Sequence, residues 1–141
     1  MTTANVELVR SICVAWEQGD FTSVGWAHPE IEFVLTGGPA DGSWKGIAGM
    51  AEGWTAWLGA WEDFRAEPDE YRALDEQRVL VLLQGSARGK ASGMELGRVR
   101  TKTAALFHLV SSKVTRLVIY FDREHGLADL GLASEADGPS A

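Results

Sequence analysis

The apolar residues of this chain change their spacing once, near Trp61, and that change sets the fold class. Before Trp61 they recur three or four positions apart, as on one face of an amphipathic helix. From Phe64 to Phe121 they fall at every second position, as in half-buried strands, and short connections between long strands favour antiparallel pairing. The pattern predicts an α+β domain in which a strongly curved, mostly antiparallel sheet wraps around N-terminal helices.

The boundaries of the predicted elements follow from this spacing and from the residues that start and stop helices. The expected helices cover Asn5–Gln18, Phe21–Trp26, Ile47–Trp61 and Asp122–Leu132. The expected strands cover Glu30–Leu35, Phe64–Leu74, Arg78–Arg88, Met94–Val110 and Lys113–Phe121. The glycine-rich segment Thr36–Gly46 lacks the Lys-Ser/Thr ending of a phosphate-binding loop, so we expect it to be a turn.

Length and composition indicate one domain. The chain has 141 residues, 45% of them hydrophobic, and we expect a single domain over residues 1–132 followed by a disordered tail over 133–141. The net charge of −7 repels nucleic acid and anionic lipid surfaces. The N-terminus lacks a signal-peptide pattern, and the apolar runs are shorter than the roughly 20 residues that cross a bilayer. We expect a soluble cytoplasmic protein with no nucleic-acid or membrane partner.

The residues that bind metals or carry redox chemistry are few and scattered. The single cysteine, Cys13, falls on an apolar helix stripe and is predicted to be a small core residue. The three histidines, His28, His108 and His125, do not have the spacing of a metal-ligand set. We therefore expect no metal and no cofactor.

The order of these elements, and four segments within it, resemble a known superfamily. The segments are "HPEIEF", "KGIAGMAEGWTAWLGAWEDFRAEPDEYRAL", "RVLVLLQGSARGKASG" and "KVTRLVIYFDREHGLADLGL". Together they resemble the nuclear transport factor 2-like superfamily, specifically its SnoaL-like (polyketide cyclase-like) branch, over nearly the whole chain. The resemblance implies a cone-shaped, cystatin-like fold with a largely apolar pocket for a small hydrophobic molecule. The superfamily includes cyclases, isomerases, dehydratases, epoxide hydrolases and non-catalytic binding modules, so the fold alone selects no activity.

Asp122 is the main catalytic candidate, and its position allows two roles. The resemblance implies an acidic residue at the end of the last strand, where a carboxylate facing an apolar pocket has a raised pKa and transfers protons, with His108 or Tyr120 assisting. Asp122 also directly precedes a helical segment, where its side chain would cap the helix. Some cyclase-like members carry a further acidic residue three positions earlier, where this chain has Ile119. That difference weakens the case for catalysis.

Two other activities of the superfamily do not fit the residues. Epoxide hydrolases place an Arg-x-Asp pair on the pocket face of the strand that resembles Arg78–Arg88, where this chain has Leu83 and Gly85. Neither residue activates a water molecule. Isomerase chemistry requires two facing carboxylates with a neighbouring tyrosine, and only Tyr120 lies near the end of the sheet.

The partner of His108 depends on the register of the last hairpin. A two-residue turn at Ser111-Ser112 pairs His108 with Thr115 and places it on the same face as Ile119, away from Asp122. Ser-Ser is a poor hairpin turn, and a bulge would shift the register and could bring His108 and Asp122 together.

Candidate ligand-binding residues come from the bulky helix faces and from the sheet. The tryptophans of the helices are first of all core residues, although one or two could line the pocket mouth and stack on a flat ligand. Arg98 and Arg100 belong to a basic hairpin edge that could also hold a ligand carboxylate. The full set of candidates is Trp16, Phe33, Trp54, Trp57, Arg98, Arg100 and Ile119.

Two hypotheses from different classes remain open. The first is a cofactor-independent cyclase, isomerase or lyase that uses Asp122 as general acid and base with His108 or Tyr120. The second is a non-catalytic ligand-binding or dimerisation module in which Asp122 only caps a helix. We also expect a homodimer formed through the sheet, because both alternation sets of the last two strands are apolar. The set predicted to lie opposite Ile119 contains Phe107, Leu109, Val118 and Tyr120.

Overall fold

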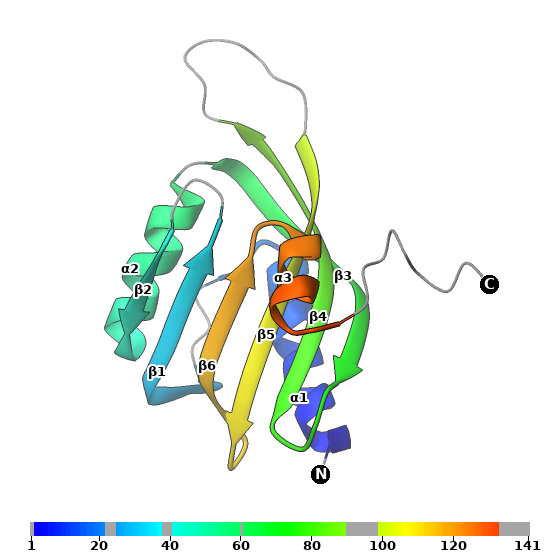
Figure 1. Cartoon of the computed structure of the whole chain (residues 1–141). Helices are drawn as coiled ribbons and strands as arrows, with labels where there is room; N and C mark the ends of the chain where they lie inside the picture. The colour runs from blue at the N-terminus through cyan, green and yellow to red at the C-terminus, as the bar shows by residue number, and fades with distance from the viewer. Residues whose placement is uncertain (1, 22–24, 38–40, 60, 90–98, 133–141) are drawn as a thin grey trace, which may run out of the picture.

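The computed structural model describes residues 2–21, 25–37, 41–59, 61–89 and 99–132. In this part of the chain the helices are α1 (Thr2–Glu17), α2 (Gly46–Leu58) and α3 (Arg123–Asp129). The strands are β1 (Ala27–Thr36), β2 (Gly42–Lys45), β3 (Trp61–Ala73), β4 (Arg78–Gly89), β5 (Val99–Val110) and β6 (Lys113–Tyr120) (Figure 1). None of the described helices has the length and apolarity needed to cross a membrane.

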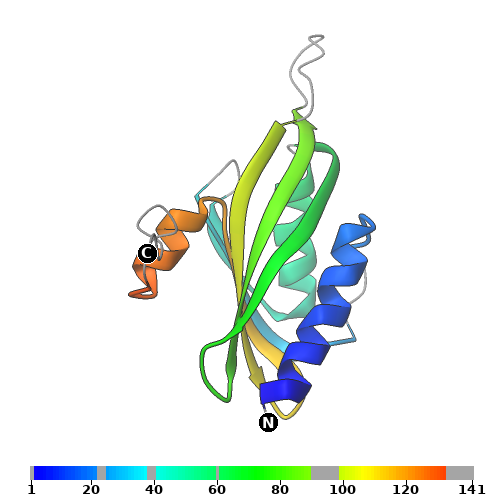
Figure 2. The ribbon, with the colours of Figure 1, turned by 90° about the vertical axis from the view of Figure 1, so that its right-hand side faces the viewer.

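The six strands form one sheet in the order β2-β1-β6-β5-β4-β3. Neighbouring strands are antiparallel except for β1 and β6, which run parallel. Viewed from its edge the sheet is bent, with α1 and α2 on one side and α3 on the other (Figure 2). The predicted α+β fold with a curved, mostly antiparallel sheet is confirmed.

The inner face of the sheet, defined here as the face under α1 and α2, carries the larger apolar core. Val81, Phe107 and Leu117 are fully buried on this face. A glycine lets α2 approach the sheet closely, because a Cβ at Gly53 would lie only 2.5 Å from Cδ2 of Phe33. Glycine weakens a helix by about 1 kcal/mol relative to alanine. At Gly53 that cost accompanies a contact that no other residue allows.

The outer face of the sheet is covered in part by α3. Leu80, Leu106 and Val118 of the sheet form a second apolar cluster with Leu127 of α3, and all four are buried. A Cβ at Gly126 would lie 2.8 Å from Cγ of Tyr120, so glycine is what lets α3 lie directly on that ring. Tyr120 also donates a hydrogen bond from its hydroxyl to Oδ2 of Asp129, at 2.7 Å. These contacts fix α3 on the sheet.

Several predicted boundaries differ from those of the structure by one to three residues. The helix expected to reach Trp61 ends at Leu58, with Gly59 as its C-cap, and Trp61 is the first residue of β3. The segment Thr36–Gly46 is more than a turn, because it contains β2, which pairs with β1. The predicted helix Phe21–Trp26 is not borne out at its described residues, because Phe21, Gly25 and Trp26 are not helical, and residues 22–24 lie outside the described residues. The predicted tail 133–141 and residues 94–98 of the predicted strand Met94–Val110 also lie outside the described residues.

The β5–β6 hairpin has the expected two-residue turn but a shifted register. Ser111 and Ser112 both have positive φ, 51° and 63°, as a tight hairpin turn of this twist requires. Val110 pairs with Lys113 as predicted, but a bulge at Thr115 then pairs His108 with Arg116. The prediction that His108 shares a face with Ile119 is therefore wrong. His108 lies on the outer face, on the same side as Tyr120.

The same shift rearranges the apolar residues that suggested a dimer. Phe107 and Leu109 belong to the inner core together with Ile119, whereas Val118 and Tyr120 lie on the outer face under α3. Val118 and Tyr120 are each only 4% exposed. The apolar surface on which the homodimer prediction rested is thus largely buried within one chain. The homodimer itself stays a prediction.

A buried arginine, Arg123, connects α3 to strands β3, β4 and β5 through hydrogen bonds. Arg123 is 3% exposed and donates from Nη2 to the carbonyl of Leu83 at 2.6 Å and to Oδ2 of Asp69 at 2.7 Å. Its Nε donates to the carbonyl of Thr103 at 3.2 Å. Leu83 pairs with Pro68, which has no N–H to donate, beside an irregularity in the β3–β4 ladder. Arg123 supplies a donor at this point of the sheet.

Replacing Arg123 by methionine should destabilise the fold strongly. Arg123→Met keeps the length of the side chain but leaves the Leu83 and Thr103 carbonyls without this donor, so we expect the free energy of unfolding to fall by about 3 kcal/mol. Urea denaturation measures the change. In the matched control, Arg72→Met removes an exposed pair in which Arg72 lies 2.6 Å from Glu70, and should cost about 1 kcal/mol or less. Equal losses in the two variants would contradict the role assigned to Arg123.

Candidate functional site

A small cavity lies between the helices and the inner face of the sheet, where the resemblance places a pocket. Its walls are mostly aromatic, and they consist of Trp16, Phe21, Trp54, Trp57 and Phe64 together with Ala66, Leu83, Thr103 and Ile119. The ring centroids of Phe21 and Trp54 are 5.0 Å apart, and those of Trp16 and Trp54 are 5.3 Å apart. This packing leaves a cavity volume of about 10 Å³, roughly enough for the centre of one water molecule.

Trp57 gives this cavity its one unsatisfied donor among the described residues. Trp57 is 1% exposed, and its Nε1 has no hydrogen-bond partner within the described part of the chain. Its ring meets those of Phe64 and Phe121 edge-on, with ring centroids 5.9 Å and 5.5 Å away. Buried tryptophan N–H groups usually find an acceptor, so this donor and the hydroxyl of Thr103 are the polar side-chain groups on the described residues that line the cavity.

Among the described residues that line the cavity, none has a side chain that could act as a general acid or base at neutral pH. Among the described lining residues the only polar side chain besides Trp57 is the hydroxyl of Thr103. Of the three residues that the resemblance places at charged positions of hydrolases and cyclases, Leu83 and Ile119 line the cavity, and Gly85 is not among its described lining residues. Aliphatic side chains therefore stand at the two lining positions where those activities need charged groups.

Asp122 caps α3 and does not line the cavity. Its Oδ1 accepts a hydrogen bond from the backbone N–H of Glu124 at 3.1 Å, and its backbone conformation is extended, as at an N-cap. The side chain is exposed. The capping role of Asp122 is what the geometry accounts for.

The predicted catalytic and ligand-binding residues lie on opposite faces of the sheet. Trp16, Trp54, Trp57 and Ile119 line the inner cavity, whereas His108 and Tyr120 line a groove on the outer face. Phe33 is buried beneath α2, with its ring centroid 4.9 Å from that of Trp54. The remaining two candidates are arginines. Arg98 lies outside the described residues, and Arg100 belongs to β5, opposite Ser86.

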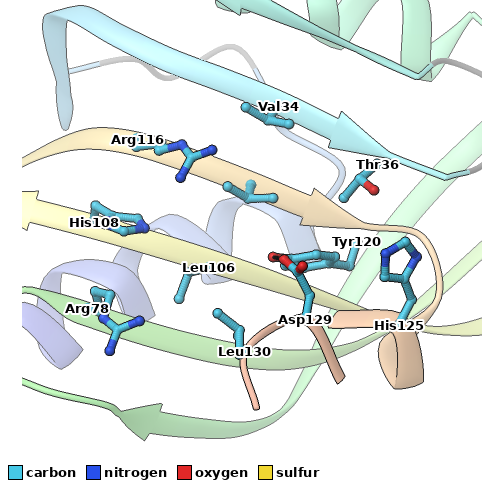
Figure 3. Close-up of a pocket in the computed structure, with 11 residues that line it drawn as sticks. Val34, Thr36, Arg78, Leu106, His108, Arg116, Tyr120, His125, Asp129 and Leu130 are labelled. Atoms are coloured by element: carbon cyan, nitrogen blue, oxygen red, sulfur yellow. Dashed lines mark hydrogen bonds between the residues drawn. The ribbon is translucent and has the colours of Figure 1, made fainter. Parts of the chain in front are cut away.

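The outer groove has a volume of about 340 Å³ and lies between β1, β6, β5, β4 and α3. Figure 3 shows Arg78, His108 and Arg116 at one end and Tyr120, Asp129 and His125 at the other. Burial raises the pKa of Tyr120 to about 12, and its hydrogen bond to Asp129 adds to the effect. Burial lowers the pKa of His108, and the nearby charges of Arg116 and Arg78 lower it further. At neutral pH both side chains are uncharged.

Sequence reasoning found two residues of this groove but not the groove. His108 and Tyr120 were selected as partners of Asp122, whereas Arg78, Arg116 and Asp129 were not selected for any role. Period-two alternation does place Arg116, Val118 and Tyr120 on one face. Assigning His108 to that face required the bulge at Thr115, which shifts the pairing by one residue.

Comparisons with known proteins identify the fold. No protein-family model matches the sequence, and no curated protein matches it. TerC, co-crystallized with polyporic acid, is 20% identical with a TM-score of 0.71, over 92% of this chain and 97% of that chain. An NTF2-like protein of unknown function from Burkholderia pseudomallei is 15% identical with a TM-score of 0.73, over 89% and 95%. A putative SnoaL-like polyketide cyclase from Jannaschia sp. CCS1 is 16% identical with a TM-score of 0.64, over 97% and 94%.

These matches define the fold of the chain. The chain has the nuclear transport factor 2-like fold that SnoaL-like proteins share, as the sequence resemblance implied. At identities of 20% or less, the matches establish the fold and leave the activity to be argued from the residues of this chain.

The two tyrosines should ionise unusually late. The pKa values of Tyr71 and Tyr120 are both raised to about 12, chiefly by burial. A tyrosine whose pKa is raised on folding contributes its full stabilisation below the pKa of the unfolded chain, near 10. That stabilisation is lost as the pH rises towards 12. We expect the ultraviolet absorbance of phenolate to appear near pH 12 after a rapid pH jump of folded protein, and near pH 10 in urea. A midpoint near 10 in the folded protein would contradict the burial of both hydroxyls.

Substitutions at Asp122 should separate capping from charge. Asparagine caps helices about as well as aspartate, so we expect Asp122→Asn to change the free energy of unfolding by less than about 0.5 kcal/mol. Asp122→Ala removes the acceptor for the Glu124 N–H and should cost about 1 kcal/mol. Denaturant unfolding of both variants provides the test. If asparagine cost as much as alanine, the negative charge of Asp122 would matter beyond the cap.

Proposed function

We propose that this protein is a non-catalytic binding module for a small, mostly apolar molecule that carries one hydrogen-bond acceptor. The ligand occupies the aromatic cavity on the inner face of the sheet. The observation that carries the proposal is the buried, unpartnered Nε1 of Trp57. A buried donor without an acceptor costs about 1–3 kcal/mol. A carbonyl or ether oxygen on an apolar ligand recovers that energy, while the ligand's rings or methyl groups meet the aromatic walls.

Binding requires the cavity to expand, and the least buried lining residues indicate where. A cavity of about 10 Å³ has no room for an organic molecule. Phe21 and Trp54 are 9% and 6% exposed, more than Trp16 at 2% or Trp57 at 1%. Phe64, which is only partly buried, is nearest the surface, followed by Phe21 and Trp54, and rotation of these rings opens a path to Trp57. The ligand then replaces contacts between aromatic rings with contacts of its own.

Binding without chemistry fits the cavity better than the alternative, a cofactor-independent cyclase, isomerase or lyase. Such enzymes move protons with a group placed within hydrogen-bond reach of the substrate. The described lining residues include no carboxylate, histidine or tyrosine, and Asp122 is engaged at the N-terminus of α3. The solved structures of similar fold include a putative polyketide cyclase and a protein crystallised with polyporic acid. They support a fold that accommodates small organic molecules, not a particular reaction.

The test compares two probes that differ in one acceptor. Acetophenone carries a carbonyl oxygen, and ethylbenzene has nearly the same shape without an acceptor. We expect acetophenone to bind up to about tenfold more tightly, which corresponds to one net hydrogen bond. The indole N–H resonance of Trp57, assigned by its loss in Trp57→Phe, should move on addition of acetophenone but much less with ethylbenzene.

Two variants make the test specific to this donor. In Trp57→Phe the preference for acetophenone over ethylbenzene should disappear. Trp44→Phe removes a half-buried tryptophan that packs on Phe33 but does not line the cavity, and it should keep the preference. Equal affinities for the two probes in the wild-type protein, or a Trp57 resonance unmoved at saturating acetophenone, would overturn the proposal.

A further inference from the structure

Charged and polar side chains form a row across four strands on the outer face of the sheet. Register places Glu32 of β1 opposite Arg116 of β6, Arg116 opposite His108 of β5, and His108 opposite Arg78 of β4. Side chains directly opposite one another in neighbouring strands have Cβ atoms about 5 Å apart. His108 is therefore flanked on both sides by a guanidinium group (Figure 3).

The carboxylates that pair with the two arginines do not lie between them. Arg116 Nε is 3.1 Å from Glu32, which lies beyond it on β1, and Arg78 Nε is 2.7 Å from Asp75, in the turn that leads into β4. A guanidinium has five N–H donors, and each of these contacts is made through Nε. Between the arginines stands His108, whose Nε2 is buried and has no partner among the described residues. An anion at His108 meets donors from three strands.

The rest of the groove is suited to an apolar group. Next to the row, Val34, Leu106 and Val118 form an aliphatic floor. The other side is lined by Leu130, the residue that follows α3, and by the hydrogen-bonded pair of Tyr120 and Asp129 (Figure 3). A volume of about 340 Å³ is that of a pocket for a small organic molecule. Polar donors at one end and an aliphatic floor beside them match an amphipathic ligand.

We propose that this groove is a second binding site, for a small organic acid with a single carboxylate. The carboxylate lies at His108 between Arg78 and Arg116, and the apolar part of the acid lies on Leu106 and Val118. This site is independent of the proposed function, since it occupies the opposite face of the sheet.

Charge balance favours a monoanion over a dianion such as phosphate. With His108 neutral, the two arginines and their two carboxylates sum to zero formal charge. One bound carboxylate makes the group −1, and protonation of His108 restores neutrality. A dianion leaves an uncompensated charge in a partly buried groove of a protein whose net charge is already −7.

Binding of the acid should therefore be coupled to the uptake of a proton by His108. The groups that face His108 are Arg116 and Arg78, which oppose its protonation, and Asp75 and Glu32, which favour it less strongly. From α3 the same groove receives Asp129, bound to Tyr120, and His125. A carboxylate placed beside His108 raises its pKa, which is below 6.5 in the free protein, so the acid binds more tightly as the pH falls from about 7.5 to about 5.5. The acid itself stays ionised in this range, because its pKa is near 4.

The experiment uses the full chain and phenylacetate as the probe. The imidazole protons of His108, followed by NMR, give its pKa with and without saturating phenylacetate, and we expect a rise of about one unit. Phenylacetamide, which has the same shape but no charge, should bind at least tenfold more weakly, as should acetate, which lacks the apolar part. At pH 8, where inorganic phosphate is a dianion, it should not compete at equal concentration.

Variants distinguish this groove from any other cationic surface. Arg116→Gln should weaken phenylacetate binding by about tenfold, the value of a charge-assisted hydrogen bond. Arg72→Gln, on an arginine that pairs with Glu70 outside the groove, should leave the affinity unchanged. If phenylacetate does not change the pKa of His108 in the wild-type protein, the proposal is overturned, and no variant is needed for that conclusion. Equal binding of phenylacetate and phenylacetamide, or displacement by phosphate at pH 8, also overturns it.

The two proposed sites have separate reporters. Phenylacetate binding in the groove moves His108, whereas acetophenone binding in the inner cavity moves the indole of Trp57. Phenylacetate that shifts Trp57 and leaves His108 unchanged has entered the inner cavity, and that result counts against the groove. Failure of the acetophenone test, with His108 still responding to phenylacetate, overturns only the proposed function.

Discussion

The buried guanidinium of Arg123 is the interaction on which the outer half of the molecule depends. Arg123 is the first residue of α3, and its donors reach the carbonyls of Leu83 and Thr103 and the carboxylate of Asp69. A charge that is 97% buried is stable only when it is paired and hydrogen-bonded. The chain therefore has one position in which α3 satisfies this group. In that position Leu127 covers the outer apolar residues, and Asp129 and Leu130 form a wall of the groove.

The space between the helices and the inner face of the sheet is held together differently, because aromatic side chains fill it almost completely. In a cone-shaped fold the space between helices and sheet is available for a ligand or for side chains. Here Trp16, Trp54, Trp57, Phe21 and Phe64 occupy most of it. Dense packing of large rings contributes stability through burial and excludes charged groups, whose desolvation would be costly. Among the described lining residues, the rings that stabilise the core leave no carboxylate, histidine or tyrosine at this cavity.

The sequence predicted the fold well because hydrophobic period is a signal repeated over many residues. No single substitution obscures the change from helical spacing to alternation, so the curved, mostly antiparallel sheet was predictable. The sites depend on single residues. One bulged residue, Thr115, moves His108 to the outer face, and no propensity rule places such a bulge. Arginine is a residue type expected on an exposed helix face, and only the hydrogen bonds of Arg123 to Leu83, Thr103 and Asp69 in the folded sheet explain its burial.

The two proposed sites differ in the free energy needed to open them for a ligand, and this difference affects their affinities. The outer groove is open at about 340 Å³ and needs only local adjustment of side chains, whereas the inner cavity must open before a ligand enters. A site whose binding-competent form is a minor population has its apparent affinity reduced by that fraction. If one molecule in about a hundred is open, the penalty is about 2.7 kcal/mol. The hydrogen bond to Trp57 offsets only part of such a penalty, and contact between ligand and aromatic rings must supply the rest. A ligand of the inner cavity is therefore expected to be strongly apolar, whereas the groove discriminates by charge.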